Sequence, residues 1–198
     1  MRSIVTGGSG FIGSHVVDKL LDAGHEVVVL DHRVKPHRSD VEFKDVDIVD
    51  FSSVLNATKD CDYIFHLAAM SNVNHVYEKP VYSVELNVTG TVNILEAARQ
   101  NSCKRVIFAS TVWVYSGCNG MYVNESSPFF MPGAGHIYSS SKIACEFLIC
   151  DYQKLYGLPY TILRYGIPYG PRMRMELVIP IFLKKAFEGE PLTLAGDG

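Results

Sequence analysis

The sequence of 198 residues lacks the apolar run of roughly 18 residues that a membrane-spanning helix needs, and it lacks a cluster of basic residues. We therefore expect no membrane span, and a net charge of −3 argues against a nucleic-acid-binding surface. A short apolar run and glycines follow Met1, a pattern unlike a signal peptide. None of the five cysteines belongs to a Cys-x-x-Cys pair. We expect no metal site and no disulfide framework, and we expect a cytoplasmic protein.

Glycine is concentrated in one stretch near the N-terminus, VTGGSGFIGS at residues 5–14. Gly7, Gly10 and Gly13 lie three apart, between an apolar run and a helical pattern. In a strand-to-helix turn this spacing is typical of a dinucleotide-binding loop. One glycine forms the tight turn, one lets a diphosphate approach the backbone, and one lets the helix pack closely on the sheet. The helix N-terminus would offer free amide donors to the diphosphate.

Asp31 supports a dinucleotide site because it ends the next apolar run, 18 residues beyond Gly13. An acidic residue near that distance binds the ribose hydroxyls of the cofactor. Its carboxylate would repel a 2′-phosphate, so NAD is favoured over NADP. The neighbouring His32 and Arg33 weaken that preference a little.

Strand patterns alternate with helix patterns along the chain. Runs as apolar as Glu26–Asp31 are typical of strands covered on both faces, as in a parallel sheet. The sequence therefore predicts an α/β fold with a Rossmann-like, doubly wound parallel sheet. Loops are expected at Val34–Asp40 and Ser116–His136. The expected strands are 3–6, 26–31, 41–47, 63–69, 105–110 and 160–165, and the expected helices are 10–24, 83–101 and 138–157.

Tyr138 and Lys142, in the segment YSSSK, lie one helical turn apart. The ammonium, together with an oxidised nicotinamide, would lower the pKa of the phenol, which could then take a proton from a sugar hydroxyl while hydride leaves its carbon. Ser110 and Thr111 end a strand, where a hydroxyl could contact the reacting oxygen. The alternative interpretation is a half-buried tyrosine beside a solvated lysine, with the hydroxyls as helix or turn caps.

Eight segments carry a resemblance to a known family: TGGSGFIGSH, VVVLD, DVDIVD, IFHLAA, ELNVTGTVNILEAA, FASTVWVY, YSSSK and LRYGIPYGPR. They occur in the family's order and cover nearly the whole chain. The sequence resembles an extended short-chain dehydrogenase/reductase of the NAD-dependent epimerase/dehydratase family, and it is similar to the UDP-glucose 4-epimerases of that family.

The resemblance implies a catalytic set of Thr111, Tyr138 and Lys142, with Thr111 rather than Ser110 in the family's Ser/Thr position. It also implies a set of NAD contacts beyond the catalytic residues and the three glycines. These contacts are Phe11, Ile12, Asp31 and His32 at the phosphate and adenosine ribose, Asp47 and Ile48 at the adenine, Leu67, Ala68, Ala69 and Ser71 beneath the cofactor, and Asn87 nearby.

The sequence departs from the family's pattern in two short stretches and in its length. Val112 and Trp113 follow Thr111, where family dehydratases and decarboxylases carry acidic residues, which disfavours a 4,6-dehydratase. Gly166 and Ile167 replace the usual Phe-Asn, which argues against strict use of UDP-galactose. Members usually continue for about a hundred residues more. We therefore expect an NAD-binding domain over 1–167 and, over 168–198, only the beginning of a smaller C-terminal substrate-binding domain.

The leading expectation is an NAD-dependent nucleotide-sugar epimerase that inverts C4 of a UDP-sugar through a keto-sugar. Two alternatives stay open: an NAD(P)-dependent reductase or dehydratase of the same family, and a non-catalytic NAD-binding sensor. The chain as it stands would bind NAD but turn over substrate poorly. Pairing of the helices 83–101 and 138–156 would support a homodimer.

Overall fold

The computed structural model describes residues 1–118, 122–129, 135–193 and 196. It divides into two compact units, Met1–Gly166 and Ile167–Gly198. The division falls one residue before the predicted domain boundary, and the substrate-binding role of the second unit stays a prediction.

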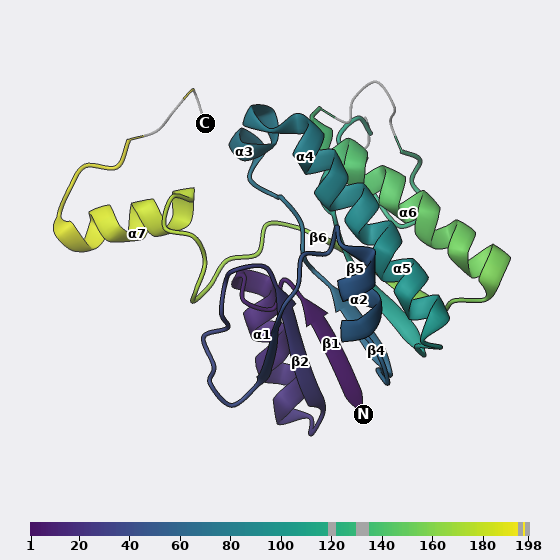
Figure 1. The fold of residues 1–198 in the computed structure, drawn as a ribbon. Coiled ribbons are helices and arrows are strands. Elements are labelled where there is room, and N and C mark those ends of the chain that lie inside the picture. Colours follow the sequence, from purple (N-terminus) through teal and green to yellow (C-terminus); the bar gives the residue numbers. More distant parts are fainter. Residues whose placement is uncertain (119–121, 130–134, 194–195, 197–198) are drawn as a thin grey trace. The chain divides into compact units, whose positions relative to one another are not determined.

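The first unit is built on a six-stranded sheet in the order β3-β2-β1-β4-β5-β6, with every neighbouring pair parallel (Figure 1). The predicted α/β, Rossmann-like sheet is confirmed. The strand order reverses between β1 and β4, and open α/β sheets bind ligands at the carboxyl ends of the strands at such a reversal. The strands are β1 Arg2–Thr6, β2 Glu26–Asp31, β3 Glu42–Asp45, β4 Tyr63–His66, β5 Arg105–Thr111 and β6 Tyr160–Tyr165.

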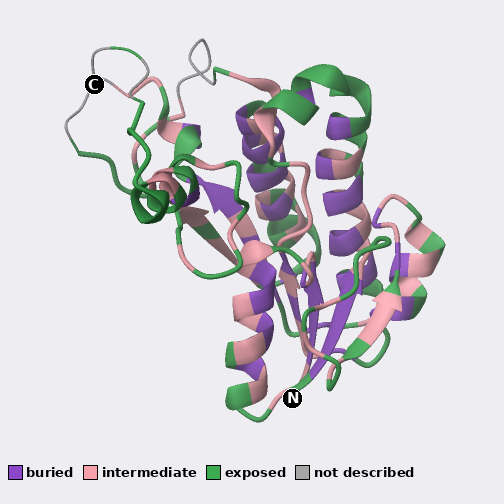
Figure 2. Cartoon of the chain, turned by 90° about the vertical axis from the view of Figure 1, so that its left-hand side faces the viewer, coloured by how far each residue is buried: buried purple, intermediate pink, exposed green. Residues whose placement is uncertain are grey.

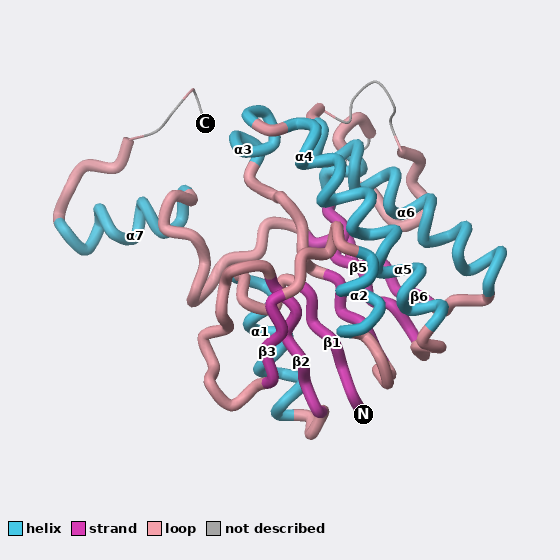
Figure 3. The backbone as a smooth tube through the Cα atoms, viewed as in Figure 1, coloured by secondary structure: helices cyan, strands magenta, loops and turns pink. Residues whose placement is uncertain are grey.

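Helices pack on both faces of this sheet (Figure 3). Val17 and Leu20 of the first helix join Val5, Val27 and Val29 in one core cluster, and three other helices contribute to a larger cluster on the opposite face. The buried residues lie along the strands and on parts of the helices (Figure 2). The main helices are α1 Phe11–Asp22, α2 Phe51–Ala57, α5 Gly90–Gln100 and α6 Ile137–Tyr156.

Sequence patterns missed the short elements and merged others. The predicted helix 83–101 is three elements in succession, α4 Pro80–Val84, a π-helical turn η1 Glu85–Thr89, and α5. The helix α2 is not among the predicted elements, although Asp50 caps it by accepting the N–H groups of Ser52 and Ser53. Two further short elements are α3 Val73–Glu78 and the 3₁₀ turn η2 Val112–Tyr115.

The second unit contains α7 Val178–Glu188, whose apolar side chains line a cleft of about 510 Å³ within this unit. Met173, Met175 and Leu183 are among the lining residues. None of the helices described by the structure is long and apolar enough to span a membrane. Among the described residues, no group of His, Cys, Asp or Glu is placed to hold a metal ion.

Candidate active site

The glycine turn between β1 and α1 has close backbone contacts at two of its three glycines and open space at the third. Gly7 has a φ of +68°, and a Cβ there would lie 2.7 Å from the backbone nitrogen of Ala68. A Cβ on Gly13 would lie 2.1 Å from the carbonyl oxygen of Gly7, so only glycine lets α1 pack on the turn. Gly10 differs, because its Cβ would meet only the oxygen of Gly7, at 3.2 Å.

Gly10 is also the N-cap of α1 and offers no side-chain hydrogen bond to the first-turn amides. The first amides of a helix have no partner within the helix. Phe11 and Ile12 follow Gly10 directly and are half-buried. This turn therefore presents backbone donors and open space together, and it fits the diphosphate of a dinucleotide.

Asp31 ends β2 beside the turn. Its Oδ2 accepts the Ser9 N–H at 3.0 Å, and its Oδ1 accepts the His32 N–H at 2.9 Å. Burial of the carboxyl group raises its pKa, while these hydrogen bonds oppose the shift. The imidazole of His32 contacts Oδ1 of Asp45 at 3.2 Å. A carboxylate held by two backbone amides is oriented to accept ribose hydroxyls as well.

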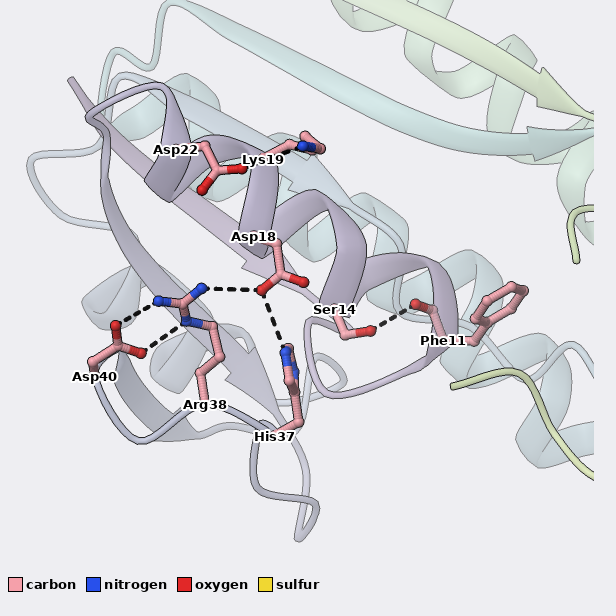
Figure 4. Close-up of polar contacts among 8 residues, drawn as sticks. All are labelled: Phe11, Ser14, Asp18, Lys19, Asp22, His37, Arg38 and Asp40. Carbon is pink, nitrogen blue, oxygen red and sulfur yellow. Dashed lines mark hydrogen bonds and ion pairs between the residues drawn. The ribbon is translucent and has the colours of Figure 1, made fainter. Parts of the chain in front are cut away.

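Two basic side chains of the loop after Asp31 are turned toward acidic side chains (Figure 4). Arg38 binds both carboxylate oxygens of Asp40, at 2.8 and 2.6 Å, and contacts Asp18 of α1 at 3.3 Å. The guanidinium lowers the pKa of Asp40 to about 2. His37 contacts the same oxygen of Asp18 at 3.3 Å. Arg38 is thus engaged with carboxylates, which agrees with a site for NAD rather than NADP.

The two predicted adenine contacts, Asp47 and Ile48, lie in the loop after β3. The Asp47 carboxylate accepts the Val49 N–H at 3.0 Å and shapes the loop. Ile48 is only 4% exposed, and its side chain packs against Gly90 at the start of α5. The side chain of Ile48 therefore belongs to the core, which leaves only its backbone for the predicted contact.

The segment after β4 runs past the carboxyl end of β1, beside the glycine turn. Leu67 donates its N–H to the carbonyl of Thr6 at 3.1 Å. Asn87 of η1 is buried and brackets Met70, accepting its N–H at 2.8 Å and donating to its carbonyl at 3.2 Å. The residues predicted to lie beneath the cofactor belong to this segment. Leu67, Ala68 and Ala69 are half-buried, and Ser71 is exposed.

The predicted catalytic residues lie at the carboxyl end of β5 and in the first turns of α6. Lys142 is 3% exposed, donates to the carbonyl of Ala109 at 2.8 Å, and lies 5.8 Å from the ring centre of Tyr138. Thr111 is buried, and its hydroxyl accepts the Trp113 N–H at 3.2 Å. Thr111 thus caps the turn η2, as the alternative interpretation expected, and it also places a hydroxyl at the end of β5.

Ser110 also contacts α6. Its hydroxyl donates to Glu146 of α6, a buried carboxylate that also pairs with Arg164 of β6 at 2.7 Å. Arg164 in turn donates to the hydroxyl of Tyr115. The Ser110 hydroxyl is thus engaged with Glu146, and the choice of Thr111 over Ser110 stays a prediction.

The predicted lowering of the tyrosine pKa is wrong for the protein alone. Burial raises the pKa of Tyr138, and the Lys142 ammonium does not overcome this effect. Burial also lowers the pKa of Lys142 to about 8, against the opposing charges of Cys145 and Glu146. Desolvation of this half-buried phenol disfavours its charged form more than the Lys142 ammonium, 5.8 Å from the ring centre, favours it.

An aromatic wall beside Tyr138 was not predicted. The His136 ring lies 6.0 Å from the Tyr138 ring, and Trp113 contacts His136 edge-on at 6.1 Å. His136 also caps α6, because its Nδ1 accepts the Ser139 N–H at 3.1 Å. Only its place two residues before the tyrosine could have marked it in the sequence.

Comparison with known proteins decides the family. The model of the NAD dependent epimerase/dehydratase family matches residues 3–198. The chain belongs to this family. It is 36% identical, over 215 residues, to a UDP-glucose 4-epimerase of Halalkalibacterium halodurans, covering 100% of this chain and 63% of that protein. It is also 36% identical, over 216 residues, to a UDP-N-acetyl-alpha-D-glucosaminuronate decarboxylase of Bacillus cytotoxicus, covering 100% of this chain and 64% of that protein.

A solved structure of this family shows the same fold with its cofactor. The UDP-glucose 4-epimerase of Thermus thermophilus, in complex with NAD, matches with a TM-score of 0.82 and 36% identity, over 98% of this chain and 65% of that one. The expectation of NAD as the family's cofactor is confirmed. This chain spans a little under two thirds of the length of these three proteins.

Proposed function

We propose that the protein is an NAD-dependent nucleotide-sugar epimerase that inverts C4 of a UDP-sugar. The observation that carries the proposal is the placement of Thr111, Tyr138 and Lys142 around the end of β5, with Val112 and Trp113 directly after the threonine. Tyr138 is the proton-transfer group of this set, and residues 112–118, which follow the threonine, include no acidic residue. Reversible hydride transfer needs one proton carrier, whereas elimination or decarboxylation calls for an additional one.

The cofactor would lie across the carboxyl ends of β1 and β4. The first turn of α1, at Gly10, would hold the diphosphate, and Asp31 would hold the adenosine ribose. Leu67, Ala68 and Ala69 would lie beneath it. NAD, when bound there, supplies a reversible hydride acceptor for the sugar carbon.

Tyr138 would take the proton from the C4 hydroxyl and return it after the keto-sugar has turned over. Lys142 would hold the phenolate by charge, and at pH 7 it is mostly protonated because its pKa is about 8. Thr111 would hydrogen-bond the same sugar oxygen. Thr111 and Lys142 are buried and Tyr138 is half-buried, which strengthens these interactions because water screens them little.

Relatives of this chain include a decarboxylase as well as an epimerase. Val112 and Trp113 favour the epimerase, because neither side chain can carry a proton. A reductase of the same family would release its cofactor after each turnover, and a sensor would bind NAD without reaction. The homodimer and the cytoplasmic location stay predictions; the exposed α6 side chains Phe147 and Leu155 support helix pairing.

The test uses the purified protein and a panel of UDP-, dTDP- and GDP-sugars, with inversion at C4 followed by proton NMR. Denaturation should release NAD, and a UDP-sugar should be epimerised without net change in the redox state of the cofactor. Tyr138→Phe should lower kcat by a factor of about 10² to 10⁴ while NAD stays bound.

Tyr152→Phe is the matched control on the same helix, because the Tyr152 hydroxyl contacts Glu96 at 3.4 Å and not the site. Its kcat should equal that of the parent. Turnover of Tyr138→Phe at the parent rate would refute the role of this tyrosine. Release of NADH with each turnover would identify a reductase instead.

A further inference from the structure

A network of hydrogen bonds surrounds the buried His66, just before the predicted cofactor contacts at residues 67–69. It includes groups that the proposed reaction does not use. His66, the last residue of β4, is 1% exposed. Its Nδ1 lies 2.7 Å from the hydroxyl of Thr6 on β1, and its Nε2 lies 3.0 Å from the hydroxyl of Thr91 on α5. Both threonines are buried as well.

The partners of the two threonines fix the position of the histidine proton. The Thr91 hydroxyl donates its proton to the carbonyl of Asn87 at 2.6 Å, so toward His66 it can only accept. The imidazole therefore carries its proton on Nε2. Burial holds the pKa of His66 at about 3, so the ring is neutral and Nδ1 has a free lone pair. It follows that Thr6 donates to Nδ1.

The hydrogen-bond network extends to the segment that follows His66. The Thr6 hydroxyl accepts the N–H of Ala68 at 3.2 Å, and the Asn87 side chain brackets the backbone of Met70. Residues 66–70 are thus attached to the protein at His66, at Ala68 and at Met70. Thr6 also immediately precedes Gly7, whose turn packs against the backbone of Ala68.

We propose that His66 is a positioning residue for the dinucleotide: as a neutral histidine of fixed tautomer, it sets the distance between the glycine turn and the floor formed by residues 67–69. The proposal rests on the proposed function, because it takes the carboxyl ends of β1 and β4 as the NAD site. The link through Thr6 matters most, since Thr6 precedes Gly7 and contacts Ala68. The link through Thr91 holds the floor to η1 and α5.

The tautomer can be tested on the unaltered protein. A long-range proton–nitrogen NMR correlation should show His66 protonated on Nε2 and bare on Nδ1 at pH 7. A proton on Nδ1 would overturn the proposal without any variant. This measurement does not depend on whether the protein binds NAD.

Variants separate the two links through the affinity for NAD, measured by calorimetry. Thr6→Val should raise Kd about tenfold, equal to about 1.4 kcal/mol, and Thr6→Ser should restore the parent value. His66→Asn keeps an acceptor near the position of Nδ1 and should bind NAD more tightly than His66→Gln, which keeps only the donor toward Thr91.

The matched control is Thr58→Val, at the end of α2. Thr58 is also fully buried and donates to a backbone carbonyl, that of Val54, at 2.9 Å. It should lose as much thermal stability as Thr6→Val with no change in Kd. Equal Kd values for the parent, Thr6→Val and His66→Gln would overturn the proposal, as would an equal loss of affinity in Thr58→Val. Absence of NAD binding in the parent would instead refute the proposed function.

Discussion

Two glycines three residues apart in the same turn should respond to substitution in opposite ways. At Gly13 an added Cβ would lie 2.1 Å from the backbone oxygen of Gly7, so the turn or the helix must move. Overpacking costs about 1–3 kcal/mol, and we take the upper value because backbone is displaced. Alanine returns about 0.5–1 kcal/mol in a helix. Gly13→Ala should therefore lower the free energy of unfolding by about 2 kcal/mol.

At Gly10 the fold should tolerate a larger side chain. The backbone there is extended, with φ −80° and ψ 178°, which valine readily adopts. Its Cβ would lie 3.2 Å from a single atom. Gly10→Val should change the free energy of unfolding by less than about 1 kcal/mol. It should weaken NAD binding at least about a hundredfold, equal to about 2.7 kcal/mol, because the methyl groups fill the space for the diphosphate.

Thermal denaturation with and without NAD distinguishes the two variants in one assay. Gly13→Ala should melt about 4–8 °C below the parent in the absence of NAD. Gly10→Val should melt near the parent and gain nothing from NAD. A Gly10→Val protein with the parent Kd would refute the placement of the diphosphate, and a Gly13→Ala protein as stable as the parent would refute the packing argument.

Two further predictions concern buried charges of α6. Lys142 has a pKa of about 8 in the folded protein and about 10.5 when unfolded. The unfolded state binds more protons between these values, so stability rises with pH in that window; relative to Lys142→Met, the parent should gain about 3 kcal/mol from pH 8 to 10.5 in urea titrations. A constant difference would contradict the burial of the ammonium. Glu146→Gln leaves the guanidinium of Arg164 without its carboxylate and should cost about 3 kcal/mol of unfolding free energy, measured in urea at pH 7. A loss below about 0.5 kcal/mol would show that the pair contributes little.

Local patterns were sufficient for the features that depend on neighbours in sequence. The apolar run Glu26–Asp31 became β2 with the same bounds, and the glycine spacing placed the turn before α1. The π-helical turn at Glu85–Thr89 could not be predicted in this way, because the residues there also suit an α-helix. Tertiary contacts of Asn87 with the loop after β4 and with α6 hold that turn.

The electrostatic state of the site depends on burial, which a sequence does not display. The spacing of Tyr138 and Lys142 predicts that they are neighbours, and they are. It cannot predict that the phenol is desolvated and that the ammonium donates to the carbonyl of Ala109. Without the nicotinamide the pKa of Tyr138 is therefore raised rather than lowered, although the pair itself was found.

The end of β5, where Thr111 lies, is joined to α6 by two hydrogen bonds. Ser110 donates to Glu146, one turn beyond Lys142 on α6, while Lys142 itself donates to the carbonyl of Ala109. Two successive turns of the helix are thus attached to two successive residues of the strand. Catalytic groups need to be held within a fraction of an ångström. Directional hydrogen bonds fix such a register more closely than apolar packing, which tolerates small shifts of a helix along a sheet.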